Sequence, residues 1–221
     1  LAIRWGNKVK PGRVITDFVS TTDLAPTFLE AAGVPVPNAM TGKSLIPVLR
    51  SDEDGRVDQE RDFMVFGRER HVPAQKMPSM AGYPSRAIRT DGWLLILNLE
   101  PDRWPAGMPK GASHPMDQYA DCDNGPTKQV IARDPESRYY ALCFAKRGEV
   151  ELYDCAADPD QVNNLAGQSK YKKTVDDLRR RLAGYLANTA DPRFTDQLVR
   201  FDEYPYRAGY MKKRLEEHGY R

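Results

Sequence analysis

The sequence is short of the residues that most often carry chemistry. It has three cysteines and three histidines among 221 residues, with no CxxC pair and no Cys/His cluster at metal-ligand spacing. Because Cys122, Cys143 and Cys155 form an odd set, we expect structural thiols, with one disulfide as the open alternative. The cysteine pattern therefore gives no support for a metal site.

Other absences exclude further classes of protein. No apolar run is long enough to span a bilayer. The net charge is +2 and the basic residues form no dense run, so no nucleic-acid-binding surface is expected. No serine or cysteine nucleophile motif, P-loop or dinucleotide fingerprint is present, and the acidic residues near position 120 lack EF-hand spacing. From its residues alone, the sequence offers no catalytic residue and no metal ligand.

The composition predicts a folded protein. The hydrophobic fraction is 40% and the charged fraction 29%, and the length suits one large domain or two small ones. No signal peptide is visible. The chain starts at Leu1, and residues 1–5 resemble the middle of a buried strand. We therefore expect the chain to begin inside a fold.

The stretch from Tyr83 to Leu99 is the centre of the predicted fold. Asp91-Gly92 lies between two strand-like runs, which is a strong hairpin signal because glycine tolerates a positive φ in a tight turn. The second run, WLLIL, is apolar enough to be buried on both faces. The first run carries Arg86 and Arg89. These arginines have two possible interpretations, a solvated strand face or contacts to an anionic ligand.

Periodicity and turn residues predict the remaining elements. Residues 100–137 are polar and rich in proline and glycine, which is typical of a functional or a disordered loop. The amphipathic pattern between Lys170 and Asn188 is the clearest helix. The other expected elements are strands over residues 1–5 and 63–67, helices over residues 24–32 and 44–50, and a second hairpin of residues 139–145 and 150–154.

A charged run follows the predicted strand of residues 63–67, which is apolar and expected to be buried. It reads Arg68-Glu69-Arg70-His71, and a strand end is a place where a fold presents polar groups to a cleft. Arginine binds sulfate, phosphate or carboxylate through its planar fork, histidine can donate or shuttle a proton, and glutamate can fix a sugar hydroxyl. The alternative interpretation is a solvated strand end with an incidental histidine.

Several stretches resemble a known family. LAIRWGNKVKPG, VSTTDLAPTFLEAAGVPVP, MTGKSLIPVL and ELYDCAADPDQVNNLA resemble the C-terminal third of a sulfatase, in the alkaline-phosphatase-like superfamily. FGRERH, YPSRAIRTDGWLLILNL and the late Asp191-Pro192-Arg193 resemble more narrowly the heparan N-sulfatases, or sulfamidases. The resemblance covers about residues 1–194 in the same order.

This resemblance implies an α/β fold, the C-terminal part of an alkaline-phosphatase-like sulfatase. It assigns residues 1–50 to the last strand and helices of the large domain. Residues 51–193 would form a small antiparallel-sheet subdomain packed by the long helix, and residues 194–221 an irregular tail. It also implies a sulfated sugar as substrate and a periplasmic, secreted or lysosomal location. His71 is expected to contact the substrate, with Glu69, Arg70 and Arg86 as further candidates.

The chemistry of such enzymes uses groups that this sequence does not show. In the family, a cysteine or serine in a C/S-x-P-x-R motif becomes formylglycine, and a calcium ion polarises the sulfate. Neither that motif nor the calcium ligands are present here, and the family places them before the position of Leu1. Cys122 stands in DCDNGP, which is not that motif. We therefore expect a sulfatase portion whose catalytic half lies outside this sequence.

Two other functions fit the same residues. One is a non-catalytic module that binds sulfated glycans through arginine and histidine. The other is part of an alkaline-phosphatase-like hydrolase that acts on phosphate. A C/S-x-P-S-R motif upstream in the same reading frame would select the sulfatase, whereas a threonine or serine nucleophile with ligands for two metals would select the phosphate hydrolase.

We predict that the 221-residue chain by itself releases no sulfate from sulfate esters or sulfamates. Recognition residues accelerate a reaction only by stabilising a transition state, and here the reacting groups are supplied elsewhere. The measurement is ion chromatography of sulfate after incubation with an N-sulfated glucosamine and an aryl sulfate. Turnover that persists after contaminating sulfatase has been removed would contradict the prediction.

Overall fold

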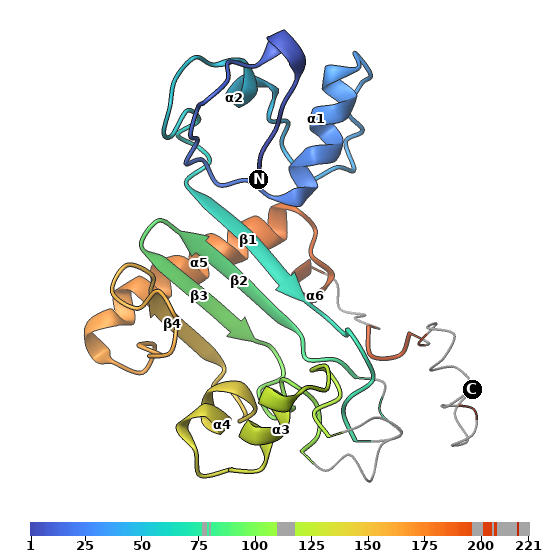
Figure 1. Ribbon diagram of the computed structural model, residues 1–221, viewed down its shortest axis with the longest axis vertical. Helices are drawn as coiled ribbons and strands as arrows, with labels where there is room; N and C mark the ends of the chain where they lie inside the picture. Colours follow the sequence, from blue (N-terminus) through green and yellow to red (C-terminus); the bar gives the residue numbers. More distant parts are fainter. Residues whose placement is uncertain are drawn as a thin grey trace. The chain divides into compact units, whose positions relative to one another are not determined.

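The computed structural model describes residues 1–76, 79, 81–109, 118–195, 201–204, 206 and 216 (Figure 1). The chain divides into two compact units. The first unit comprises Leu1–Met64 with Arg89–Asp91, and the second comprises Val65–Ile88 with Gly92–Arg221. Residues 51–64 thus lie with the first unit.

A buried carboxylate organises the first unit. Asp23 closes a capping box with Ser20 at the 3-10 helix η2 (Thr21–Asp23). It also accepts from the backbone N–H of Lys43 and from Arg61 Nη1, both at 2.8 Å. Arg61 in turn donates to the carbonyl oxygens of Lys43 and Ser44. The loop before helix α2 (Ile46–Arg50) is thereby fixed on the start of helix α1 (Leu24–Ala31). The unit contains η1 (Gly6–Lys8), η2, α1 (Leu24–Ala31) and α2 (Ile46–Arg50).

The two helices predicted in this unit are confirmed, but the strand predicted over residues 1–5 was wrong. Leu1–Trp5 has no strand structure and is mostly exposed, because no described strand takes up its backbone hydrogen bonds. The apolar residues of α1 are only partly buried, and Phe28 retains 65% of its accessible surface. The buried positions of α1 are instead Pro26 and Thr27.

A sheet with the order β1-β2-β3-β4 organises the second unit. Strands β3 and β4 are antiparallel, and Leu95 pairs with Leu152, both fully buried. Helix α5 covers one face of the sheet (Figure 1) with Val175, Leu178, Leu182 and Leu186 buried. The strands are β1 (Phe63–Arg68), β2 (Ser85–Thr90), β3 (Trp93–Asn98) and β4 (Val150–Asp154), and α5 runs over Lys172–Asn188. The predicted Asp91-Gly92 hairpin and the long helix are confirmed.

Strand β1 is not buried as the sequence predicted. It lies at the edge of the sheet, and its last three residues are exposed. An edge strand has a neighbour on one side only, so apolar residues such as Phe66 keep solvent contact. The chain that leaves β1 therefore starts from an exposed edge.

The predicted second hairpin was wrong in its first half. Residues 138–143 form helix α4 (Arg138–Cys143), whose N-cap Ser137 accepts from the backbone N–H of Tyr139. Tyr140 and Phe144 lie four residues apart, so both rings reach Tyr119, and the ring centroids of Phe144 and Tyr119 are 4.3 Å apart. Aromatic residues favour strands in general, but here this packing decides for a helix.

The long polar loop also contains a helix that the sequence reading missed. Helix α3 (Pro126–Ala132) begins with a proline in its first turn, a position that proline favours because its missing N–H needs no partner there. Cys122, Cys143 and Cys155 are all free thiols. The structure therefore contains no disulfide between them. In the described part of the chain, no helix has both the length and the apolar character that crossing a bilayer requires. A short helix, α6 (Pro192–Thr195), follows α5.

Two glycine substitutions should have opposite effects on stability. A Cβ at Gly42 would lie 2.2 Å from the carbonyl oxygen of Thr22, so Gly42→Ala should destabilise the protein by about 1–3 kcal/mol. Gly184 lies on the exposed side of α5 with open space around it, so Gly184→Ala should stabilise by roughly 0.5–1 kcal/mol. Urea midpoints followed by circular dichroism compare the two. Equal midpoints would show that the contact at Gly42 is relieved at no cost.

Candidate functional site

The charged run leaves the end of β1, where the backbone passes close to β2. A Cβ at Gly67 would lie 2.6 Å from the carbonyl oxygen of Ser85 and 2.8 Å from Cδ of Arg86. A residue with a side chain would therefore displace Arg86. The glycine of the FGRERH stretch allows β1 to end directly beside that guanidinium.

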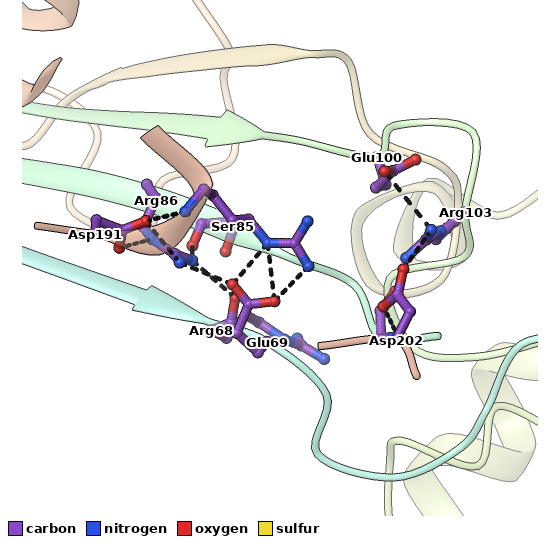
Figure 2. Close-up of polar contacts among 10 residues, drawn as sticks. Arg68, Glu69, Ser85, Arg86, Glu100, Arg103, Asp191 and Asp202 are labelled. Carbon is purple, nitrogen blue, oxygen red and sulfur yellow. Dashed lines mark hydrogen bonds and ion pairs between the residues drawn. The ribbon is translucent and has the colours of Figure 1, made fainter. Parts of the chain in front are cut away.

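Arg86 uses all five of its N–H donors within the protein. Nε and Nη2 donate to the two oxygens of Asp191 at 2.7 and 3.2 Å, and Nη2 also donates to Glu69 Oε1 at 2.8 Å. Nη1 donates to the carbonyl oxygens of Arg68 and Ser85. Figure 2 shows the two carboxylates approaching Arg86 from different parts of the chain. The guanidinium is buried, so these contacts replace its hydration.

Glu69 is equally well satisfied. Its two oxygens accept from Arg86 and from Nε and Nη2 of Arg193, at distances between 2.6 and 3.0 Å. Burial lowers the pKa of Arg86, but the hydrogen bonds and charges of Asp191 and Glu69 outweigh it, so the pKa lies above its ordinary value. The bond to Glu69 likewise raises the pKa of Arg193. Both guanidinium groups therefore remain charged.

This network changes what the sequence suggested for two of its candidate residues. Arg86 and Glu69 hold each other and the segment that follows α5, so neither has a bonding group to spare for a ligand in this arrangement. Their direct contact with substrate stays a prediction. Arg89 was the other strand arginine, and it donates to the backbone carbonyl oxygens of Thr90 and Asp91 at the hairpin turn.

Arg70 lies against the described residues near the C-terminus. Its Nη2 donates to the carbonyl oxygen of Tyr204 at 2.7 Å, and its guanidinium lies over the ring of Tyr206. Burial lowers the pKa of Arg70, and the charge of Asp202 raises it only in part. Figure 2 shows Asp202 paired with Arg103, and it also accepts from the backbone N–H of Gly82. Arg70 is therefore half-buried under this segment.

His71 is the most accessible member of the run. Its side chain is 77% exposed, and its Nδ1 lies 2.7 Å from Oδ1 of Asp121, whose side chain is only 7% exposed. The other oxygen of Asp121 accepts from Nη2 of Arg68. Among the described residues, Nε2 of His71 has no hydrogen-bond partner. The structure therefore presents an anchored imidazole with one ring nitrogen open to solution.

The loop that carries Asp121 is held from several sides. The backbone N–H of Asp121 donates to the carbonyl oxygen of Ala106, and the backbone N–H of Tyr119 donates to the carbonyl oxygen of Met108. Lys128 is buried, and its ammonium group donates to the carbonyl oxygens of Tyr119 and Cys122 and to Asn124 Oδ1, at 2.6 to 3.0 Å. These three bonds use every ammonium donor, so the loop has one closely defined shape.

Sequence reasoning did not pair His71 or Arg86 with the carboxylates that hold them in this site. Asp121 is 50 positions from His71, and Asp191 is 105 positions from Arg86. The DNG turn before Pro126 is the one local signal for the loop that Lys128 holds. The acidic residues that lack EF-hand spacing in the sequence are Asp102, Asp117, Asp121 and Asp123, and Asp117 lies outside the described residues. Within the described ranges, no three His, Cys, Asp or Glu residues gather closely enough to hold a metal ion, so no calcium site is assigned here.

Slightly less than half of the chain matches a known family. Residues 1–105 match the family described as "N-sulphoglucosamine sulphohydrolase, C-terminal". This range contains the charged run and the central hairpin.

Two curated relatives match most of the chain. Human N-sulphoglucosamine sulphohydrolase is 29% identical over 196 residues, which is 82% of this chain and 34% of the relative. An ulvan-active sulfatase of Formosa agariphila is 26% identical over 192 residues, which is 85% of this chain and 32% of the relative. The chain thus spans about a third of the length of these proteins.

A solved structure shares the fold. A protein in complex with its substrate D-glucosamine-2-N,6-O-disulfate superimposes with a TM-score of 0.55 at 23% identity, over 88% of this chain and 29% of that one. This likeness agrees with the predicted α/β class and with the small antiparallel sheet covered by a helix.

Removing Asp191 should destabilise the protein strongly. Breaking a buried ion pair costs about 3–5 kcal/mol, and because Glu69 still neutralises Arg86 we expect roughly 2–3 kcal/mol for Asp191→Ala. The matched control is Asp176→Ala, which removes an exposed pair with Lys172 and should cost about 0–0.5 kcal/mol. Urea unfolding compares both with the unchanged protein. Similar losses for the two would show that the Arg86 network adds nothing beyond a surface pair.

Proposed function

We propose that this chain, a C-terminal sulfatase domain, forms part of the substrate-binding wall of an enzyme that hydrolyses sulfate esters or N-sulfates of a sulfated sugar. In the proposal, His71 contacts the sugar directly. The rest of the charged run and the loop that carries Asp121 hold it in place.

The observation that carries this proposal is the state of His71. An exposed histidine at a strand end is ordinarily mobile and solvated. Here its ring is anchored to a buried carboxylate and keeps Nε2 open, at the end of a strand whose neighbouring charges are already paired. A side chain held this way loses little freedom when it binds a ligand, which favours a recognition role.

The names of the relatives support a sulfated sugar as the substrate class. One relative is named for N-sulphoglucosamine, another for ulvan, and the structural neighbour was solved with a disulfated glucosamine. We therefore propose sulfated glucosamine as the first substrate to test and sulfated ulvan oligosaccharides as the second. The resemblance also implies a periplasmic, secreted or lysosomal enzyme, and that location is part of the proposal.

Arg70 is the second candidate contact. Arg70 directly precedes His71 in the sequence, and its guanidinium is held by contacts with Tyr204 and Tyr206. It therefore places a positive charge near the same strand end. Glu69 and Arg86 contribute in this proposal by holding that strand end rigid. Their network with Asp191 and Arg193 ties it to the segment after α5.

The reacting groups of the family are calcium and formylglycine, which supply charge stabilisation and the nucleophile when present. The described residues form no cluster that would bind the metal, and the sequence has no C/S-x-P-x-R motif. The chain's own residues are therefore assigned binding and orientation alone. The phosphate-hydrolase alternative has less support, because the relatives named above are sulfatases or sulfohydrolases.

We predict that His71→Ala in the full-length enzyme lowers kcat/KM for the sulfated sugar about ten- to a hundredfold, the cost of one hydrogen bond to a charged group. Turnover of a small aryl sulfate, which does not reach this wall, should be nearly unchanged. Sulfate release measured on both substrates gives the ratio. His71→Gln, which can place an amide nitrogen near the position of Nε2, should recover part of the loss.

Lys173→Ala is the matched surface control, because its side chain is 87% exposed on α5 and forms a pair with Asp177 that lies far from the run in sequence. It should leave both rates unchanged. Equal losses on the sugar and the aryl sulfate would assign His71 to folding, and unchanged sugar turnover would remove it from the site.

A further inference from the structure

We infer that Asp121 is a positioning residue that fixes the tautomer of His71, so that the unprotonated Nε2 of the neutral ring faces a sugar hydroxyl. The inference rests on the proposed function of His71 and adds the atom and its hydrogen-bonding role. It assigns to the sugar a hydroxyl that donates to Nε2.

The chemistry of the pair determines where the proton lies. An ionised carboxylate can only accept hydrogen bonds, and Asp121 Oδ1 lies 2.7 Å from Nδ1 of His71. The neutral imidazole must therefore carry its proton on Nδ1. Nε2 is then an acceptor, and it belongs to a side chain that is mostly exposed.

Arg68 determines which oxygen of Asp121 faces His71. Its Nη2 donates to Asp121 Oδ2 and to the carbonyl oxygen of Pro105, and a guanidinium has no acceptor. The carboxylate therefore has one oxygen committed to a cation and the other to the imidazole. With the backbone N–H of Asp121 on Ala106 and the loop held by Lys128, the carboxylate has little freedom to turn.

An amide at position 121 should reverse the tautomer. In Asp121→Asn the side chain has one oxygen, and Arg68 requires it because the guanidinium can only donate. The NH2 group then faces His71, and Nδ1 must accept from it. The ring proton moves to Nε2, which becomes a donor and can no longer accept from a sugar hydroxyl. The same logic makes an aspartate-to-asparagine change costly beside a catalytic histidine.

The tautomer can be measured directly in the full-length protein labelled with 15N-histidine. Long-range 1H–15N spectra distinguish Nδ1–H from Nε2–H rings, and loss of one signal set in His71→Gln assigns the residue among the three histidines of this sequence. Spectra are recorded where the ring is neutral. We expect Nδ1–H in the unchanged protein and Nε2–H in Asp121→Asn.

A second substitution separates positioning from folding. In Arg68→Met/Asp121→Asn the amide oxygen is no longer held by Arg68 and can turn to His71. The ring should return to Nδ1–H, and kcat/KM for the sulfated sugar should rise again. Asp121→Asn alone should lose about ten- to a hundredfold on the sugar and little on the aryl sulfate. When Asp121→Asn is combined with His71→Ala, it should add no further loss, because both substitutions remove the same interaction with the sugar.

The two proposals fail in different ways. An Nε2–H ring in the unchanged protein, or an Nδ1–H ring in Asp121→Asn, overturns the inference whatever His71→Ala does. Normal sugar turnover in Asp121→Asn with a reversed tautomer also overturns it. Normal turnover in His71→Ala overturns the proposed function itself. A urea midpoint for Asp121→Asn close to that of the unchanged protein shows that the kinetic loss does not come from unfolding.

Discussion

The guanidinium of Arg86 is the interaction on which the candidate site depends. It is buried, all five of its donors are used, and its two carboxylate partners come from the end of β1 and from the segment after α5. Removing one of them would leave buried N–H donors of Arg86 without an acceptor, although the other carboxylate would still neutralise its charge. This arrangement requires a glycine at position 67, because a side chain there would occupy the space of Arg86.

Because that network is closed, the substrate contact that we propose is assigned to the neighbouring residues. Glu69 has its oxygens filled, whereas His71 keeps one ring nitrogen open and the other on a buried carboxylate. A rigid ionic anchor thus stands beside an accessible, oriented imidazole. This division between support and contact is what a binding wall requires, since rotamers that are already fixed lose little entropy on binding.

The prediction errors have a common physical origin. Residues 138–143 carry aromatic side chains typical of a strand, but packing of Tyr140 and Phe144 on Tyr119 selects a helix. Strand β1 looked buried because it is apolar, yet its place at the sheet edge leaves it half exposed. Local composition reports the preference of a segment, and its neighbours in the fold decide the outcome.

The sequence by itself determined the hairpin at Asp91-Gly92, the amphipathic α5 and the resemblance to the C-terminal part of sulfatases, and the structure and comparisons confirm these. Each of these features depends on residues that lie close together in the sequence, so turn residues, helical periodicity and short motifs are enough to predict it. The pairing of His71 with Asp121 and of Arg86 with Asp191 was decided only by the tertiary structure. Those partners lie 50 and 105 positions apart, and nothing local distinguishes them from other acidic residues. Only the packing of the loop and of the segment after α5 brings a particular carboxylate within hydrogen-bond reach.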